Sequence, residues 1–265
     1  MVVKNHYLCS IKINIVLTLK PKSMPNHIQN ILYVESNTRE ELDLFLNTIK
    51  GEDEVIDFNS IVPMPKEIKE TESSTNTDNA LAYYLKITNK EDELKSINKF
   101  RYPTFFPQNK LDKLSEQERT DLFNVGERYF NIFKTYGYLN WYDWSLGNWG
   151  TKWNAYETSM SSPTETSVSI YFQTAWSGVP MLIEMLVQKF PNLSFEYKFA
   201  DEDRGHNCGQ GNGSNGEFEF TYFEGGSDEA YEQYRYCWGY DESEFFKAEN
   251  GEWYFIDEYE EENED

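Results

Sequence analysis

Residues 167–199, SVSIYFQTAWSGVPMLIEMLVQKFPNLSFEYKF, predict a strand, a helix and a second strand. Apolar and polar side chains alternate in Ser167–Thr174 and again in Leu193–Phe199, which is the period of a half-buried strand. Between them, Pro180 suits the first turn of a helix over Met181–Phe190. The apolar face of that helix is formed by Leu182, Ile183, Leu186 and Val187.

A similar unit lies upstream. Ile28–Glu35 predicts a strand, and Asn37 is the expected cap of the helix that follows, with Glu40 at the capping-box position. Val55–Val62 predicts the next strand. Two strand–helix–strand units predict the α+β class, as a ferredoxin-like split βαβ antiparallel sheet with helices on one face.

The segments around these units complete the expected organisation. The polar run Glu70–Asn79 predicts an exposed loop, and a helix is expected to begin at Ser115, with Glu118 in a capping box, and to end at Gly137. The glycine-rich run Gly205–Gly216 lacks the Gly-Lys-Ser/Thr of a phosphate loop and predicts a flexible turn. Additional strands are expected at Glu217–Phe223 and Trp253–Ile256.

We therefore expect four segments. They are an N-terminal extension (1–23), a ferredoxin-like domain (24–200), a β-rich acidic and aromatic C-terminal extension (201–257) and an acidic tail (258–265). Within the second segment, residues 79–138 form a helical insert and residues 140–157 a Trp-rich stretch. Translation is as consistent with a start at Met24 as with one at Met1.

Composition limits the functions to consider. The 265 residues carry a net charge of −22, and Glu224–Asp265 contains 16 acidic residues against 2 basic ones. Such a surface repels nucleic acid. No apolar run reaches the roughly 20 residues of a membrane span. Three cysteines without a spacing motif favour a reducing cytoplasm.

Five motifs occur in order and together resemble a known family. They are Met24-Pro-Asn26, Ile61-Val-Pro-Met-Pro65, Trp141-Tyr-Asp-Trp144, Asn148-Trp-Gly-Thr-Lys-Trp153 and Thr174-Ala-Trp-Ser177. The chain is similar over about residues 24–211 to the YubB-like proteins of phages and conjugative plasmids. The resemblance implies a ferredoxin-like domain without an iron–sulfur cluster, carried on a mobile element, and no known reaction. His27-Ile28 and Ser145 replace cysteine-containing positions common in relatives, so thiol chemistry is not expected.

Four tryptophans fall within Trp141–Trp153, and this density predicts either a core or a groove. As a core, the indoles pack the insert onto the sheet. As a groove, they hold a small ligand or a peptide, with Lys152 as the only cation between Lys134 and Lys189. The candidate groove residues are Trp141, Trp144, Asn148, Trp149, Thr151, Lys152, Trp153 and Trp176.

No catalytic set, metal site or cofactor is predicted. The histidines are His6, His27 and His206, and neither of the last two lies near a nucleophile-elbow motif. His206 and Cys208 are two residues apart, but no second metal-ligand pair completes the pattern.

The acidic C-terminal extension is unusual because aromatic residues are interleaved with its acids, which disordered acidic tails lack. It predicts an outer layer of the fold or a contact with a basic partner. The candidate partner-binding residues are Tyr231, Tyr234, Tyr236, Trp238, Asp241, Glu242, Glu244 and Trp253.

Three functions remain open. The first is an accessory protein of a phage or plasmid that binds a host protein, with inhibition of a bacterial defence system through a nucleic-acid-like acidic surface as its most economical form. The second is a small-ligand binder or enzyme that uses the Trp groove. The third is a single-stranded nucleic-acid-binding sheet that stacks bases on aromatic residues, against which the charge argues. The sequence does not indicate an oligomeric state.

Overall fold

The structure, a computed structural model, describes residues 26–93, 106 and 108–263. The expected N-terminal extension, with His6 and Cys9, lies outside the described residues, as do residues 264–265 of the acidic tail.

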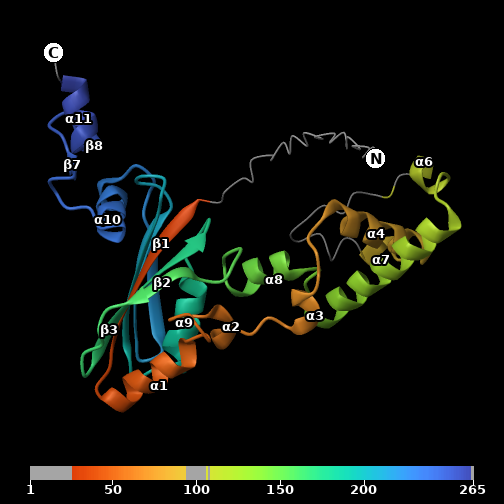
Figure 1. The fold of residues 1–265 in the computed structure, drawn as a ribbon, viewed down its shortest axis with the longest axis horizontal. Coiled ribbons are helices and arrows are strands. Elements are labelled where there is room, and N and C mark those ends of the chain that lie inside the picture. The colour runs from red at the N-terminus through yellow and green to blue at the C-terminus, as the bar shows by residue number, and fades with distance from the viewer. Residues whose placement is uncertain (1–25, 94–105, 107, 264–265) are drawn as a thin grey trace, which may run out of the picture.

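The centre of the fold is a six-stranded sheet (Figure 1). Its strands are β1 (His27–Glu35), β2 (Tyr156–Met160), β3 (Ser167–Ala175), β4 (Ser194–Asp201), β5 (Cys208–Ser214) and β6 (Glu217–Tyr222). They lie in the order β2-β3-β1-β4-β5-β6, and every neighbouring pair is antiparallel. The first four strands with α1 (Arg39–Ile49) and α9 (Pro180–Lys189) form the split βαβ arrangement of a ferredoxin-like domain. The predicted fold class is confirmed.

Helices α1 and α9 cover one face of the sheet and bury its main core. Alternate side chains of β1 and β3, such as Leu32 and Phe172, meet Phe45 of α1 and Leu186 of α9, and all four are fully buried. Pro180 starts α9 as predicted. The cap of α1 is Thr38 rather than Asn37, because its Oγ1 accepts the backbone N–H of Glu41 at 3.2 Å.

The strand predicted at Val55–Val62 is wrong. The segment forms a loop and a single helical turn, α2 (Phe58–Ile61), because Asp57 Oδ1 accepts the N–H of Asn59 at 2.8 Å and caps that turn. Ile56 and Phe58 are nevertheless buried in the main core, so the alternation in the sequence reflects burial without a strand ladder. The edge of the sheet beside β3 is occupied instead by β2, which follows the insert.

The insert therefore lies between α1 and β2, and it is longer than 79–138. It contains α2, α3 (Lys66–Lys69), α4 (Thr75–Ile87), η1 (Glu91–Glu93), α6 (Gln108–Leu111), α7 (Glu116–Tyr136) and α8 (Trp141–Asn148). Helices α4 and α7 pack along each other in an arm that extends from the sheet (Figure 1). Helix α7 begins at the capping box of Ser115 with Glu118 and ends at the left-handed Gly137, as predicted.

The predicted loop at Glu70–Asn79 is wrong over its second half. Ser74 begins α4, because its Oγ accepts the N–H of Thr77 while the Thr77 hydroxyl accepts the N–H of Ser74. A polar run can therefore start a helix when its hydroxyl groups occupy the cap positions.

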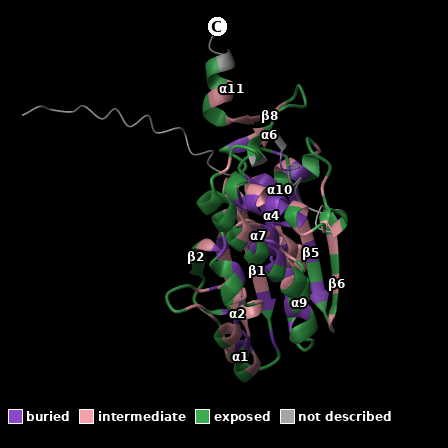
Figure 2. Ribbon diagram, turned by 90° about the vertical axis from the view of Figure 1, so that its right-hand side faces the viewer, coloured by how far each residue is buried: buried purple, intermediate pink, exposed green. Residues whose placement is uncertain are grey.

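The glycine-rich segment is also not a turn, because residues 208–214 form strand β5. Its glycines make room for aromatic rings of the neighbouring strands. A Cβ on Gly211 would lie 2.6 Å from Phe218 Cζ, and one on Gly209 would lie 2.7 Å from Phe220 Cζ. Glycine is required here for close approach, which is one of its uses inside strands. Strand β6, which carries these rings, is the largely exposed free edge of the sheet (Figure 2).

The rest of the C-terminal extension covers the opposite face of the sheet. Helix α10 (Asp228–Trp238) packs on β4, β5 and β1, where Ile31, Ala200 and Cys208 point away from the main core. A hairpin of β7 (Phe245–Lys247) and β8 (Trp253–Phe255) packs against α10, and α11 (Ile256–Asn263) follows it. We call α10, β7, β8 and α11, residues 228–263, the C-terminal lobe.

The contact between α4 and α7 generates the first prediction. Alanine at Gly126 of α7 would place its Cβ 2.2 Å from the Ala80 carbonyl oxygen and 2.5 Å from Tyr84 Cβ. In an open helix, replacing glycine with alanine stabilises by about 0.5–1 kcal/mol. Here we expect Gly126→Ala to destabilise by about 1–3 kcal/mol, since neither neighbour is a flexible chain end. Urea unfolding measures the effect, with the exposed Val125→Ala as the control. A Gly126→Ala protein more stable than the parent would contradict the helix contact.

Candidate binding surfaces

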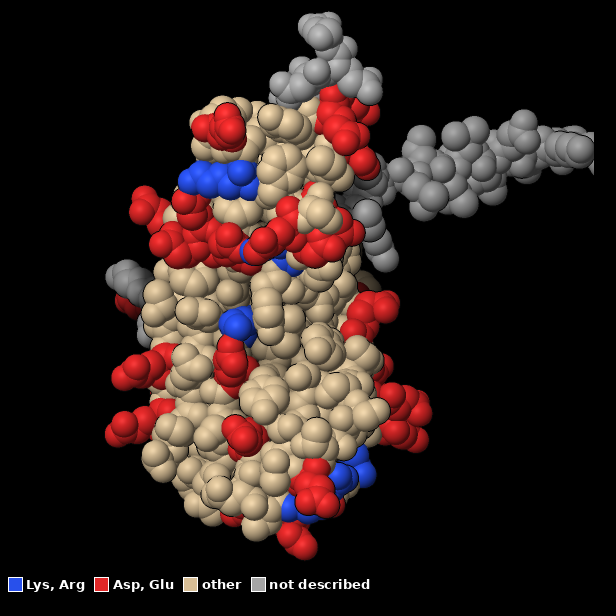
Figure 3. Space-filling model, turned by 90° about the vertical axis from the view of Figure 1, so that its left-hand side faces the viewer, with Lys and Arg blue, Asp and Glu red and all other residues tan. Residues whose placement is uncertain are grey.

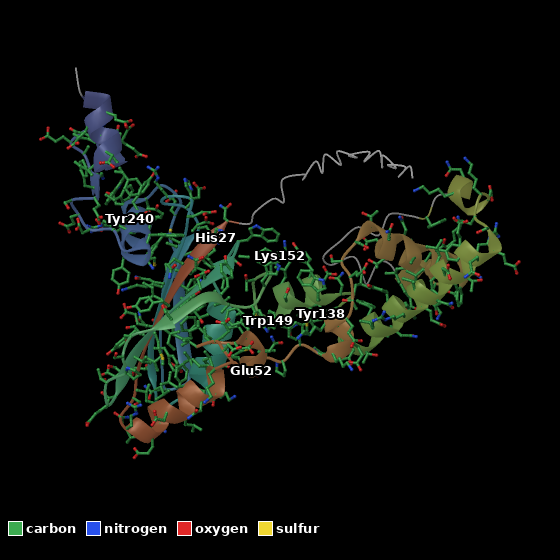
Figure 4. All side chains as sticks on the ribbon, in the orientation of Figure 1. His27, Glu52, Tyr138, Trp149, Lys152 and Tyr240 are labelled. Carbon is green, nitrogen blue, oxygen red and sulfur yellow. The ribbon has the colours of Figure 1, made fainter. Side chains whose placement is uncertain are left out.

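The tryptophan run lies at the junction between the insert and the sheet. Trp144 and Trp149 are buried in the main core, where their rings meet edge to face at 5.2 Å. Trp149 also packs against Phe58, and its indole N–H donates to the Val62 carbonyl at 3.0 Å. Figure 4 shows Trp149 between the sheet and the insert. These two indoles join the insert to the sheet.

Three further candidate groove residues make bonds that hold the same junction. The backbone N–H of Trp141 donates to Thr71 Oγ1 at 2.9 Å, and the indole is half-buried against the main core. Asn148 Nδ2 donates to the Trp144 carbonyl at 2.9 Å. Thr151 is fully buried, and its hydroxyl donates to the Ala175 carbonyl at 2.8 Å. Trp141, Asn148 and Thr151 therefore stabilise the junction between the insert and the sheet.

The remaining three, Lys152, Trp153 and Trp176, come together at the surface, and we call them the Lys152 cluster. The ammonium nitrogen of Lys152 lies 4.5 Å from the ring centroid of Trp153 and 4.4 Å from that of Trp176. The two tryptophans are 39% and 38% exposed. Among the described residues, no carboxylate pairs with Lys152. The cluster is thus a lysine held between two partly exposed indoles.

The backbone of Trp176 is left-handed, with φ +71°, which is an outlier for so bulky a residue. Hydrogen bonds on both sides hold it there. Its N–H donates to the Asn26 carbonyl at 3.0 Å, and its carbonyl accepts from Asn207 Nδ2 at 3.0 Å. Such a conformation costs about 1–3 kcal/mol and persists only where its surroundings impose it, commonly at functional sites.

Two other left-handed residues lie at the same end of the sheet as Trp176. Asn207 (φ 46°) is its hydrogen-bond partner, and Glu157 (φ 47°) lies in an irregularity of β2. Tyr156, beside Glu157, accepts a hydrogen bond from His27 Nδ1 at 2.7 Å because its own hydroxyl donates to the Thr174 carbonyl. Burial, with Glu202 and Glu157 nearby, raises the pKa of Tyr156 to about 12, so it stays a neutral donor.

The C-terminal lobe has an aromatic core of its own. Tyr234 is buried, and Tyr231, Trp238 and Trp253 are half-buried. Trp253 stacks on Tyr231 and on Phe245, with centroid distances of 5.4 Å in both cases. The indole N–H of Trp238 donates to the Asp201 carbonyl at 3.0 Å, which fixes α10 to the sheet. Four of the candidate partner-binding residues therefore build the lobe.

The other four candidates lie on the surface of the lobe. Tyr236 is 56% exposed, and Asp241, Glu242 and Glu244 are exposed in the loop after α10. Figure 3 shows a band of acidic residues across this part of the molecule, above a larger sheet surface with few charged residues. The structure thus separates the aromatic residues, mostly inside, from the acids outside.

Ion pairs order part of the acidic band. Lys247 pairs with Asp228 at 2.6 Å, and its hydrogen bond, with that of the Trp253 indole, lowers the pKa of the Asp228 carboxyl. Arg235 pairs with Glu232 and Glu242. Two hollows of about 530 and 380 Å³ share Asp228, Glu232 and Arg235 in their walls. The acids are presented around shallow concavities on a folded scaffold.

In the described part of the chain, the His, Cys, Asp and Glu side chains form no candidate metal site. No group of three His, Cys, Asp or Glu side chains there is placed to hold a metal ion. His206 is exposed, whereas Cys208 turns inward under α10. In the described ranges no helix has the length and apolar character needed to cross a membrane.

The match to a family model supports the ferredoxin-like fold. Residues 148–247 match the family described as a ferredoxin-like domain in Api92-like protein. Among solved structures, protein api92 from Yersinia pseudotuberculosis is similar at 9% identity and a TM-score of 0.39, over 77% of this chain and 99% of that one. No curated protein matches the chain. The family match runs from the end of α8 through strands β2 to β6, α9 and α10 to β7, so it includes the Lys152 cluster and α10 but not β1.

The burial difference within the tryptophan run generates a paired prediction. Trp149→Ala empties a buried site and is expected to cost about 3–5 kcal/mol of unfolding free energy. Trp153→Ala removes a partly exposed ring and is expected to cost less than about 1 kcal/mol. Denaturant unfolding followed by circular dichroism measures both. Equal losses in the two variants would contradict the division into core and surface.

The two described cysteines generate a further prediction. Burial raises the pKa of Cys208 to about 12 and that of Cys237 beyond it. A raised pKa leaves only about one Cys208 in ten thousand as the reactive thiolate at pH 8. We expect iodoacetamide to modify neither residue in the native protein at pH 8 and both after unfolding in urea, as read by peptide mass spectrometry. Rapid native labelling of Cys237 would show that the inner side of α10 is not packed against the sheet.

Proposed function

We propose that this chain is a binding protein that docks a basic surface of a partner protein on the acidic face of its C-terminal lobe. The resemblance to YubB-like proteins extends the proposal to the partner's source. It makes the chain an accessory protein of a phage or plasmid and the partner a cytoplasmic host protein. A component of a bacterial defence system that normally grips nucleic acid is the partner class that such a surface fits.

One observation carries the proposal, namely that the acids are displayed by a folded scaffold. A solubilising tail needs neither a buried aromatic core nor fixed side chains. Here the lobe buries Tyr234 and Phe245, and Arg204 holds Glu258 of α11 through two hydrogen bonds of 2.7 Å. Preorganised charges lose less freedom on binding, so a fixed acidic face is suited to specific recognition.

The shape of the lobe suits a basic partner. The larger hollow lies between α10 and the sheet, and Asp228, Glu229 and Glu232 stand in its wall. Tyr236 projects beside it, with its ring 4.2 Å from the ammonium of Lys198. An exposed aromatic ring next to carboxylates is a favourable partner for an arginine or lysine side chain, because it combines stacking with charge pairing.

The test substitutes charges without removing the lobe. Deleting 224–265 would uncover Ala200 and Cys208 and so damage the sheet, which makes the truncation uninformative. The variant Glu229→Gln/Glu242→Gln removes two exposed carboxylates from the acidic band. The matched control, Glu40→Gln/Glu127→Gln, removes two exposed carboxylates from α1 and α7 and leaves the same net charge.

We expect the full chain to capture a basic protein from host lysate. Affinity for the purified partner should fall about tenfold in the first variant, equivalent to about 1.4 kcal/mol, and stay unchanged in the control. Raising the salt concentration should weaken the partner's binding to the parent chain more than its binding to Glu229→Gln/Glu242→Gln. Calorimetry with the purified partner measures these effects. Equal affinities of the two double variants, or binding insensitive to salt, would refute the proposal.

A further inference from the structure

We infer that the Lys152 cluster is a second binding site, independent of the acidic lobe, and that its ligand is a single carboxylate attached to an apolar or aromatic body. The site lies at the end of the sheet where β3 ends and β1 begins. His27 pairs with Ala175 in the sheet register, which places β1 next to Trp176. Figure 4 shows His27 and Lys152 at this end.

The first argument is the inventory of hydrogen-bond donors. The ammonium of Lys152 has three N–H groups, and the indoles of Trp153 and Trp176 have one each. Within the described ranges, none of these donors meets a protein acceptor, which is also true of the Trp141 and Trp144 indoles, whereas Trp149, Trp238 and Trp253 use theirs. Donors without acceptors suit an anion.

The second argument is charge. The chain has 46 acidic and 24 basic residues, so a lysine has carboxylates to pair with on most of its surface. Glu157 and Glu202 both act on neighbouring Tyr156, yet neither pairs with Lys152. The ammonium instead lies 4.4 and 4.5 Å from the ring centroids of Trp176 and Trp153. Lysines such as Lys50 and Lys69 also make no ion pair, but among the described residues Lys152 alone lies against two tryptophan rings.

The third argument is backbone strain. Within the described part of the chain, five residues other than glycine have positive φ, and Asn89 and Asn215 are ordinary turn asparagines. The other three, Glu157, Trp176 and Asn207, belong to this end of the sheet. The strain at Trp176 sets the direction in which its indole leaves the backbone, and through that contact it sets the position of Lys152.

The ligand class follows from these features. One cation matches one negative charge, and the net charge of −22 on the chain disfavours a dianion such as phosphate. The partly exposed indole faces beside the ammonium offer apolar surface to the rest of the ligand. Both a free aromatic acid and the C-terminal carboxylate of a peptide have this chemistry.

The test uses benzoate and, as its uncharged isostere, benzamide. The indole N–H resonances of the full chain are recorded by ¹H–¹⁵N NMR at constant ionic strength, and those of Trp153 and Trp176 are assigned with the two Trp→Phe variants. We expect benzoate to shift both resonances saturably and benzamide to shift neither to saturation. In Lys152→Met, which keeps the apolar stem, the benzoate shift should be lost, whereas Lys152→Arg should retain it. The remaining indole signals report whether each variant is folded.

A second arm distinguishes the two sources of the carboxylate. A short peptide that ends in phenylalanine is titrated with a free and with an amidated C-terminus. Tighter binding of the free-acid peptide than of benzoate indicates a chain end, and the reverse indicates a small molecule. The inference is overturned if neither benzoate nor the free-acid peptide shifts either indole resonance saturably. It is also overturned if benzoate shifts these resonances in Lys152→Met as it does in the parent protein.

Discussion

The position of Trp149 is the constraint on which the rest of the structure depends. The chain leaves the sheet after α1, forms the whole helical insert and must return at β2 to complete the split βαβ unit. Trp149 fixes that return: its ring packs against Phe58 at the start of the insert, and its N–H bonds the Val62 carbonyl. The same indole sets where the next residues emerge, so Lys152 and Trp153 reach the surface beside Trp176. A core contact thereby positions the Lys152 cluster, the proposed second binding site.

The two faces of the sheet serve different purposes. Helices α1 and α9 bury one face in an aliphatic and aromatic core, as a ferredoxin-like domain requires. The other face is covered only in part, by α10, whose inner residues pack on β1, β4 and β5 while its outer residues carry carboxylates. One side of α10 therefore stabilises the sheet, and the other side carries the carboxylates of the proposed docking surface. Because α10 shields Ala200 and Cys208 of the sheet, loss of the lobe would affect the domain itself as well as its surface.

Local patterns in the sequence identify much of the fold. Strand alternation, the Ser115 capping box, Gly137 and Pro180 depend on neighbours within a few residues, and the structure has them as predicted. The errors arise where tertiary contacts decide. Ile56 and Phe58 are buried like alternate residues of a strand, but they have no strand partner. The glycines of β5 leave space for the rings of Phe218 and Phe220, which the sequence does not indicate. Strand β2 is polar, so no apolar alternation marks it as a strand. The candidate groove could be located but not divided into core and surface, because Trp176 meets Lys152 only through the fold.

The most direct measurement of the central claim is a hydrogen–deuterium exchange footprint of the full chain with and without its captured partner. The claim is that a folded acidic lobe is the docking surface. It predicts that the partner slows exchange in 228–247, in α10 and the loop and strand that follow, and leaves the α4 and α7 amides unchanged. It also predicts that α10 exchanges slowly in the unbound protein, since its inner side is buried. Protection confined to the helical arm, or an α10 that exchanges at random-coil rates before binding, would contradict it.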